Sequence, residues 1–248
     1  MQFCRQLLGV QKNTTNIGVL LELGRTPLVL DAQKAAIKNW ERIKNSKANH
    51  LVIKSYENAC TESLDWINNI QNLLGRNGMR NLFIENTPKN VHSKFYNRAK
   101  DIYHQESFST ILDVASKLRT YGLMKYKIGR EDYLTEIRNT KLRSKLSKFR
   151  LSNHKLMIEI GRHMKLQIHE RICQVCQKCV EDEVHFLINC EPYEAIRIPL
   201  FDYCTELKSQ FPYYTDEEKF IFIMTSSHLA HNAAKFIDNA LNIRDAYL

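Results

Sequence analysis

One short segment rich in cysteine constrains this chain more than any other feature of its sequence. Residues 170–193 read ERICQVCQKCVEDEVHFLINCEPY, and the spacing C-x2-C-x8-H-x4-C joins Cys173, Cys176, His185 and Cys190. Three thiolates and one imidazole fill the tetrahedral coordination of Zn²⁺ and leave no position open for water or a substrate. The spacing therefore predicts a structural zinc ion in a small CCHC knuckle, and not a catalytic metal.

Other cysteine and histidine residues nearby are alternative candidates for the four ligands. Cys179 is also separated from Cys176 by two residues and can replace a ligand, and His163 and His169 are close in the sequence. The same pattern is compatible with reduced, partly buried cysteines that hold no metal. Even with zinc bound, many such modules only staple a loop and do not touch nucleic acid.

Cysteine usage and composition limit the class of protein. The chain has 248 residues, which suffice for one large domain or two modest ones, and 44% of them are hydrophobic. Its seven cysteines are an odd number, and no cleavable signal peptide precedes them, so zinc in a reducing compartment is favoured over a disulfide scaffold. The longest apolar runs, such as residues 220–224, are too short to cross a bilayer. We expect a soluble intracellular protein, nuclear or cytoplasmic, with no membrane partner and no small-molecule substrate.

Helices are expected to dominate, because the chain holds only 8 glycines and 5 prolines. The pattern predicts helices over residues 28–46, 50–74 (as one or two), 91–119 (with a possible break at 110–112), 131–149, 193–209, 215–225 and 228–245. Only residues 81–84 and a hairpin inside the knuckle have β character. The predicted fold is all-α, a multi-helix bundle with one CCHC zinc knuckle. We expect three parts: a helical scaffold over 1–130, the basic helix plus knuckle over 131–195, and a C-terminal helical layer over 196–248.

The positive charge of the chain is concentrated before and within the knuckle. The net charge is +9, which implies polyanionic partners. Between residues 138 and 171 the only acids are Glu159 and Glu170, while the basic residues are Arg138, Lys141, Arg143, Lys145, Lys148, Arg150, Lys155, Arg162, Lys165 and Arg171. Spacings of three and four residues on the predicted 131–149 helix form one cationic stripe from Arg138, Lys141, Lys145 and Lys148. Such a stripe can follow the phosphates of a nucleic acid, although a merely solvated helix face has the same pattern.

These segments resemble a known family over nearly the whole chain. Residues 141–163 (KLRSKLSKFRLSNHKLMIEIGRH), the ERICQVC and VEDEVHFLINCEPY runs and Arg197 closely resemble the C-terminal region of reverse transcriptases from LINE-type non-LTR retrotransposons of animals. Residues 3–28 (FCRQLLGVQKNTTNIGVLLELGRTPL) resemble the segment that follows the polymerase thumb in the same proteins, and residues 118–134 also fit. The 1–130 part would then be a post-thumb scaffold.

The resemblance implies a role in gripping element RNA and target DNA during target-primed reverse transcription. It implies that the four knuckle residues are zinc ligands, and that Arg143, Lys148, Arg150 and His154 contact nucleic acid. Together with the charge pattern, the predicted contact set is Arg138, Lys141, Arg143, Lys145, Lys148, Arg150, His154 and Arg162. The expected partners are RNA, DNA or both.

No motif of an enzyme is found in this sequence. The aromatic-x-Asp-Asp motif of the family's polymerase palm is missing, and so is the carboxylate set of the endonuclease found in some relatives. We therefore expect a non-catalytic, nucleic-acid-binding protein. The alternative is a helical protein-interaction module in which the zinc is only a staple. The acidic run 181–183 is expected to pair with Lys178 or Arg171.

Overall fold

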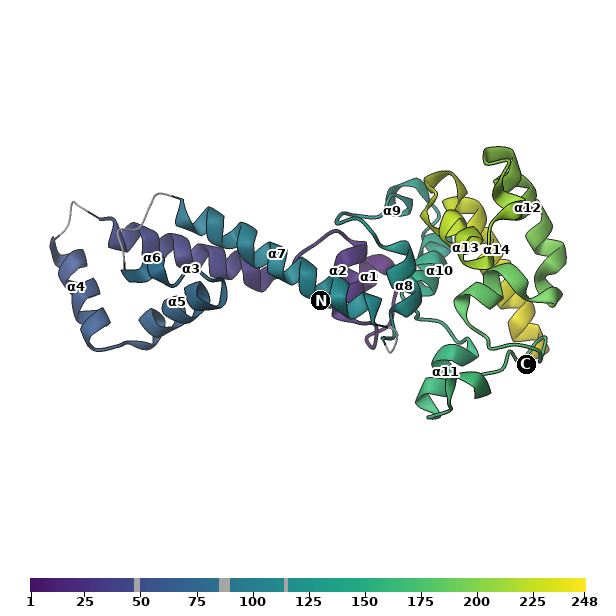
Figure 1. Ribbon diagram of the computed structural model, residues 1–248, viewed down its shortest axis with the longest axis horizontal. Helices are drawn as coiled ribbons and strands as arrows, with labels where there is room; N and C mark the ends of the chain where they lie inside the picture. Colours follow the sequence, from purple (N-terminus) through teal and green to yellow (C-terminus); the bar gives the residue numbers. More distant parts are fainter. Residues whose placement is uncertain (47–49, 85–89, 114–115) are drawn as a thin grey trace. The chain divides into compact units, whose positions relative to one another are not determined.

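The computed structural model describes residues 1–46, 50–84, 90–113 and 116–248 (Figure 1). Within these ranges every regular element is a helix, and β pairing is limited to two isolated antiparallel bridges, Leu23 with Arg130 and Ile172 with Val180. The predicted all-α fold with a small Cys3His group is therefore confirmed. Among the helices of the described residues, none combines the length and the apolar character that a membrane crossing requires.

The chain divides into two compact units. The first unit combines residues 1–25 with residues 108–248, and the second contains residues 26–107. Each unit has its own hydrophobic core. The boundaries predicted from the sequence, at residues 130 and 195, do not coincide with these unit boundaries, because residues 1–25 pack with the C-terminal half of the chain.

The second unit is a small helical bundle. Its helices are α3 (Leu28–Lys44), α4 (His50–Thr61), α5 (Asp65–Arg76), α6 (Asn81–Ile84) and the part of α7 (Val91–Leu112) up to residue 107. Trp40 is buried in its core, stacks on Phe83 at 5.7 Å between ring centroids and donates a hydrogen bond to Tyr56. The predicted helix over 28–46 is confirmed. The β character predicted for 81–84 is wrong, because these residues form the short helix α6.

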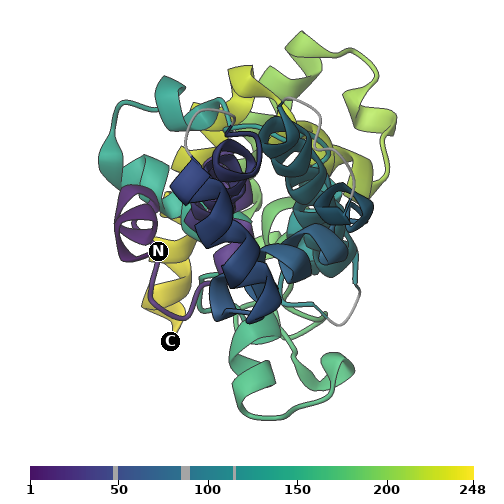
Figure 2. The same ribbon diagram turned by 90° about the vertical axis from the view of Figure 1, so that its left-hand side faces the viewer.

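Helices α3 and α7 run antiparallel, as the purple and teal helices of this unit show (Figure 1), and the turned view looks along them from the end (Figure 2). The Lys34 ammonium of α3 lies over the Tyr96 ring of α7, at 4.6 Å. Two turns further along α3, Glu41 accepts hydrogen bonds from the backbone N–H groups of Asn90 and His92. A carboxylate from α3 thus satisfies amides at the start of α7, which have no partner within their own helix.

The first unit contains the knuckle and the whole basic segment 138–171. Its α-helices are α1 (Gln2–Leu8), α2 (Asn16–Glu22), α8 (Arg119–Met124), α9 (Tyr133–Glu136), α10 (Thr140–Arg150), α11 (Met157–His163), α12 (Glu194–Leu207), α13 (Asp216–Thr225) and α14 (Ala230–Tyr247). Short 3₁₀ turns cover Ile168–Glu170, Glu191–Tyr193, Phe211–Tyr213 and Ser227–Leu229, and a π turn covers His185–Asn189. Helix α10 packs on α14. The aromatic rings of Phe149, Phe186, Tyr193 and Phe236 contact one another in the core in tilted and edge-on arrangements.

The single helix predicted over 131–149 is wrong in one respect. It is two helices, α9 and α10, separated by residues 137–139. Ile137 between them is buried, and the side chain of Asn139 accepts hydrogen bonds from the amides of Lys141 and Leu142 and so caps α10. Asparagine is a strong N-cap residue, so Asn139 was the signal for this break.

Candidate metal centre and basic surface

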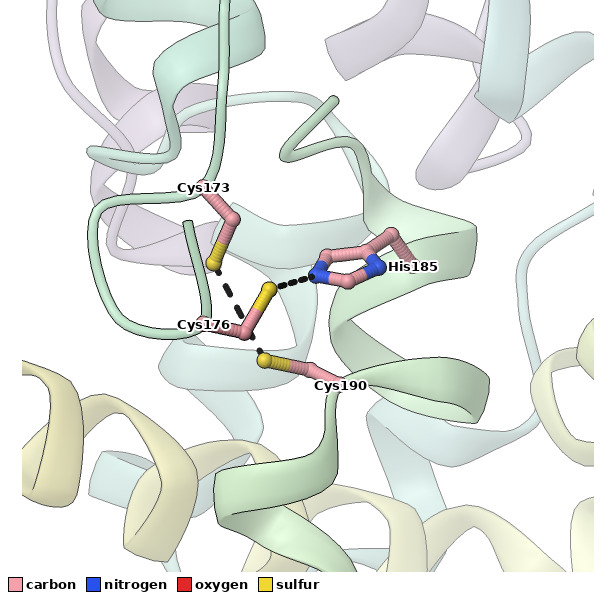
Figure 3. Close-up of side chains that lie close together, drawn as sticks. All are labelled: Cys173, Cys176, His185 and Cys190. Atoms are coloured by element: carbon pink, nitrogen blue, oxygen red, sulfur yellow. Dashed lines mark hydrogen bonds between the residues drawn. The ribbon is translucent and has the colours of Figure 1, made fainter. Parts of the chain in front are cut away.

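The four predicted metal ligands lie together in the first unit. One sulfur or nitrogen atom from each of Cys173, Cys176, His185 and Cys190 lies within 4.8 Å of all the others (Figure 3). Cys173, His185 and Cys190 are buried, and Cys176 is partly exposed. The group can hold a metal ion.

The first two cysteines are placed by a tight turn. Ile172 and Val180 form an antiparallel bridge, and the amide of Cys173 donates to the carbonyl of Cys179 across the turn. Gln177 has a left-handed backbone with φ of 57°, which lets the chain reverse immediately after Cys176. The predicted hairpin is thus present only as this one bridge.

The other two ligands are placed by the π turn. Asp182 accepts a hydrogen bond from the amide of His185 and caps its start. The amide of Cys190 then donates to the carbonyl of His185, a separation of five residues. Residues five apart lie on one side of a π turn, so the x4 spacing between His185 and Cys190 matches this local structure.

Two of the distances between the candidate ligand atoms are close to those around a tetrahedral ion. Sulfur and nitrogen ligands at ~2.0–2.3 Å from a tetrahedral metal lie roughly 3.3–3.8 Å from one another. The Cys176 sulfur is 3.3 Å from Nε2 of His185, and the sulfurs of Cys173 and Cys190 are 3.9 Å apart. The hydrogen bond between the latter two sulfurs lowers the pKa of Cys173 and raises the pKa of Cys190. A bound cation would instead stabilise all the thiolates, because ligands bind metals in their deprotonated form.

The geometry favours the predicted set over its alternatives. Cys179 is exposed and is not part of the group, and His163 and His169 are exposed as well. Lys178, the residue before Cys179, forms an exposed ion pair with Glu191, 2.7 Å apart. This pair joins the turn of the first two cysteines to the segment that follows Cys190.

The acidic run 181–183 fastens the knuckle to the helices, and its expected pairing with Lys178 or Arg171 is wrong. Glu181 is fully buried and accepts hydrogen bonds from Arg244 of α14 (2.7 Å) and from the amide of Met157 (2.6 Å). It also lies 3.8 Å from the sulfur of Cys173. The guanidinium of Arg171 instead donates to backbone carbonyls, those of Ile158 and Leu166.

Glu183 is the second buried carboxylate of this run. It accepts hydrogen bonds from Thr120 (2.8 Å) and Ser152 (3.0 Å), and it lies 3.0 Å from Nε2 of His154 and 3.3 Å from Arg119. Burial alone would raise the pKa of Glu183, but the hydrogen bond and charge of His154 and the charge of Arg119 lower it to about 2. An ionised Glu183 therefore ties the knuckle to α8 and to the loop after α10.

Two residues of the predicted nucleic-acid contact set are buried, and for them the prediction is wrong in this conformation. Arg150 donates to Glu22 (2.7 Å), to Glu131 (2.7 Å) and to the carbonyl of Met224 (2.6 Å). Its side chain is 1% exposed. Burial alone would lower the pKa of Arg150, but the charges of Glu22 and Glu131 raise it. The side chain of His154 is 3% exposed and faces Glu183.

The remaining residues of the contact set are more accessible. Arg138 and Lys141 are exposed, although Arg138 precedes α10 and so is not on its stripe. Lys145 forms an ion pair with Asp238 of α14 (3.0 Å). Lys148 and Arg162 are partly exposed, and Arg143 lies 3.4 Å from the carbonyls of Leu134 and Ile137.

Comparison with known proteins identifies no relative of this chain. No family model, no curated protein and no solved structure matches it.

Proposed function

We propose that the four-residue group binds a structural zinc ion. Thiolate and imidazole ligands in tetrahedral order are the ones that Zn²⁺ prefers, and four protein ligands leave no place for a substrate. The spacing of the ligand atoms, all within 4.8 Å, is the observation that supports this proposal. The ion would hold the turn of Cys173 and Cys176 against the π turn of His185 and Cys190.

We further propose that the chain is a non-catalytic protein that binds RNA or DNA. The support is the position of accessible cations on one helix and its flanks: Arg138, Lys141, Lys145, Lys148 and Lys155. Contacts of lysine and arginine with phosphates fix the position of a protein on nucleic acid without reading its sequence. The helix that carries them is anchored by the buried pairs of Arg150 and, through Glu183, to the proposed zinc knuckle.

The resemblance to LINE-type reverse transcriptases suggests the biological setting. Under this proposal the chain acts as the C-terminal region of such an enzyme, and it grips RNA or DNA during target-primed reverse transcription. The polymerase and endonuclease chemistry would belong to other segments, because their motifs are missing from this sequence.

Metal content tests the first proposal. We expect about one zinc per chain in the purified protein and none in Cys176→Ser. The matched control is Cys179→Ser, which changes a cysteine of the same turn that lies outside the group and should keep its metal. Equal zinc content in all three proteins, or no metal in the wild type, would contradict the structural site.

Binding across salt tests the second proposal. Fluorescence anisotropy with labelled single-stranded RNA and duplex DNA should show an affinity that falls steeply with salt. Contact with about three phosphates gives a slope of log K against log salt of roughly −2 to −3. No binding at low salt, or an affinity that does not change with salt, would contradict this function.

One observation favours the alternative, a helical protein-interaction module. A groove of about 380 Å³ between α12 and α14 is lined in part by Ile196, Pro199, Leu200 and Phe236. A protein that lacks salt-dependent nucleic-acid binding but keeps its zinc would support this second candidate.

A further inference from the structure

A small pocket lies where three segments of the first unit meet. Its volume is about 180 Å³, and its walls come from α10, from α14, from the loop after α10 and from Gln11 near the N-terminus. Three of its lining residues are lysines, namely Lys145 and Lys148 of α10 and Lys155 of the loop. Lys155 is not on the stripe predicted from the sequence, so the pocket differs from a cationic helix face.

The loop that carries Lys155 is held firmly on both sides. The side-chain carbonyl of Asn153 accepts a hydrogen bond from the amide of Gln11 (3.0 Å), and its amide group lies 3.4 Å from the side-chain oxygen of Asn13. On the other side Ser152, with a left-handed φ of 49°, donates to the buried carboxylate of Glu183. These contacts fix the backbone from which Lys155 extends, so the pocket is formed before any ligand arrives.

The charges that face the pocket leave it positive. Lys145 is paired with Asp238, and Arg244 is paired with Glu181. Asp245 is the one carboxylate among the residues that line the pocket. Within the described residues, no carboxylate lies at ion-pair distance from Lys148 or Lys155. Two lysine ammonium groups therefore outweigh one carboxylate, and the pocket favours an anion.

The volume of the pocket limits the size of the anion that it can hold. Sites for whole small-molecule ligands have volumes of about 300–1,000 Å³, whereas a water molecule takes up about 30 Å³. A volume of about 180 Å³ suits one phosphate group with a few waters, and not a complete free nucleotide.

We propose that this pocket receives one backbone phosphate of the bound nucleic acid, held by Lys148 and Lys155 with Lys145 at its edge. The inference rests on the proposed nucleic-acid binding and gives it a defined contact. Two residues of the predicted contact set would act as supports and not as phosphate ligands. Arg150 is buried and anchors α10, and His154, although it lines the pocket, turns its ring nitrogen to Glu183.

The test compares two double variants of the full chain. Lys148→Gln with Lys155→Gln removes the two pocket charges, and Lys208→Gln with Lys235→Gln removes two exposed charges of the same unit outside the pocket. With a labelled single-stranded oligonucleotide, we expect the pocket variant to bind at least about tenfold more weakly, since it loses charge-assisted hydrogen bonds to the phosphate. Its salt slope should be flatter by about 0.7, the value for one phosphate on a single strand. The control variant should keep most of the wild-type affinity.

Acetylation of lysines followed by mass spectrometry gives a second measurement that needs no variant. Lys148 and Lys155 should be protected by the oligonucleotide, while Lys208 and Lys235 should react as in the free protein. If the wild type binds but the two double variants weaken it equally and Lys148 and Lys155 are not protected, the pocket is excluded and the proposed function stands. If the wild type does not bind at all, both are overturned.

Discussion

Arg150 shows how the partner of a residue decides its role. A basic segment suggests phosphate contacts, yet this guanidinium lies between two carboxylates, Glu22 and Glu131, from distant parts of the chain. The hydroxyls of Tyr121 and Tyr133 also donate to Glu22. The buried carboxylate of Glu22 is thus fully satisfied, and the pair locks α2 to α10.

Removal of Arg150 should therefore destabilise the first unit strongly. In Arg150→Met the buried Glu22 loses its counter-charge, and breaking a buried pair from one side costs about 3–5 kcal/mol. Urea unfolding followed by circular dichroism measures this loss. The double variant Glu22→Gln with Arg150→Met should recover part of it, because no buried charge is then left unpaired. Wild-type stability in Arg150→Met would show that the pair does not hold α10.

Glu41 has a comparable role in the second unit, and there the consequence is a dependence on pH. Burial alone would raise the pKa of Glu41, but hydrogen bonds from the His92 ring and from the amides of His92 and Asn90 lower it below its ordinary value of 4.5. The ionised carboxylate therefore stabilises the fold above this ordinary value. That contribution is lost as the pH falls through the lowered pKa.

The variant Glu41→Gln should lose about 1 kcal/mol of stability near neutral pH, the usual effect of a lost helix cap. Its difference from the wild type should shrink as the pH falls through the lowered pKa of Glu41, because the wild-type carboxylate then becomes protonated and uncharged as well. Both tryptophans, Trp40 and Trp66, are in this unit, so urea unfolding followed by tryptophan fluorescence reports on it alone. A difference between variant and wild type that is independent of pH would contradict the assignment.

At the scale of elements, the knuckle depends on a helix far along the chain. Arg244 of α14 donates to Glu181, which lies beside the sulfur of Cys173, and to the side chain of Gln174 between the first two cysteines. Residues that orient metal ligands in this way commonly change metal affinity 10–100-fold when they are lost. Helix α14 therefore supports the ligand geometry as well as the hydrophobic core.

We accordingly expect Arg244→Met to bind zinc about 10–100-fold more weakly than the wild type. Lys235→Met is the matched control, because it changes an exposed cation of the same helix. Competition with a chromophoric chelator measures both affinities. Equal affinities in the two variants would mean that α14 does not position the ligands.

The sequence predicted the local features of the fold and the site, and missed those that depend on distant partners. The four proposed ligands lie within 18 residues, and two short turns bring them together, so their spacing alone predicted that these side chains form a group. Helices with strong start signals were also predicted, as for α13, where Thr215 and Glu218 form a capping box. By contrast, Arg150 meets Glu22 across 128 positions and Arg244 meets Glu181 across 63. No periodicity in the sequence predicts such a pairing, so the sequence indicates a surface contact for Arg150 and no role for Arg244.

At the scale of the whole molecule, the two cores differ in composition, and the proposed metal ligands belong to one of them. The four proposed ligands and the buried partners of Glu181 and Glu183 are all in the first unit. Two ligands, Cys173 and Cys190, belong to its hydrophobic core, whereas the core around Trp40 and Phe95 contains no ligand. A structural metal contributes its binding free energy to the folding of the unit that holds it.

Removal of metal should therefore affect the two units unequally. With a strong chelator, or in Cys176→Ser, we expect the urea midpoint detected by circular dichroism to fall for the helices of the first unit. The midpoint detected by tryptophan fluorescence should stay at its wild-type value, since both reporters are in the second unit. Cys179→Ser should leave both signals unchanged. If the urea midpoint from fluorescence falls together with the one from circular dichroism, the stability of the second core depends on metal bound to the knuckle, which would contradict this prediction.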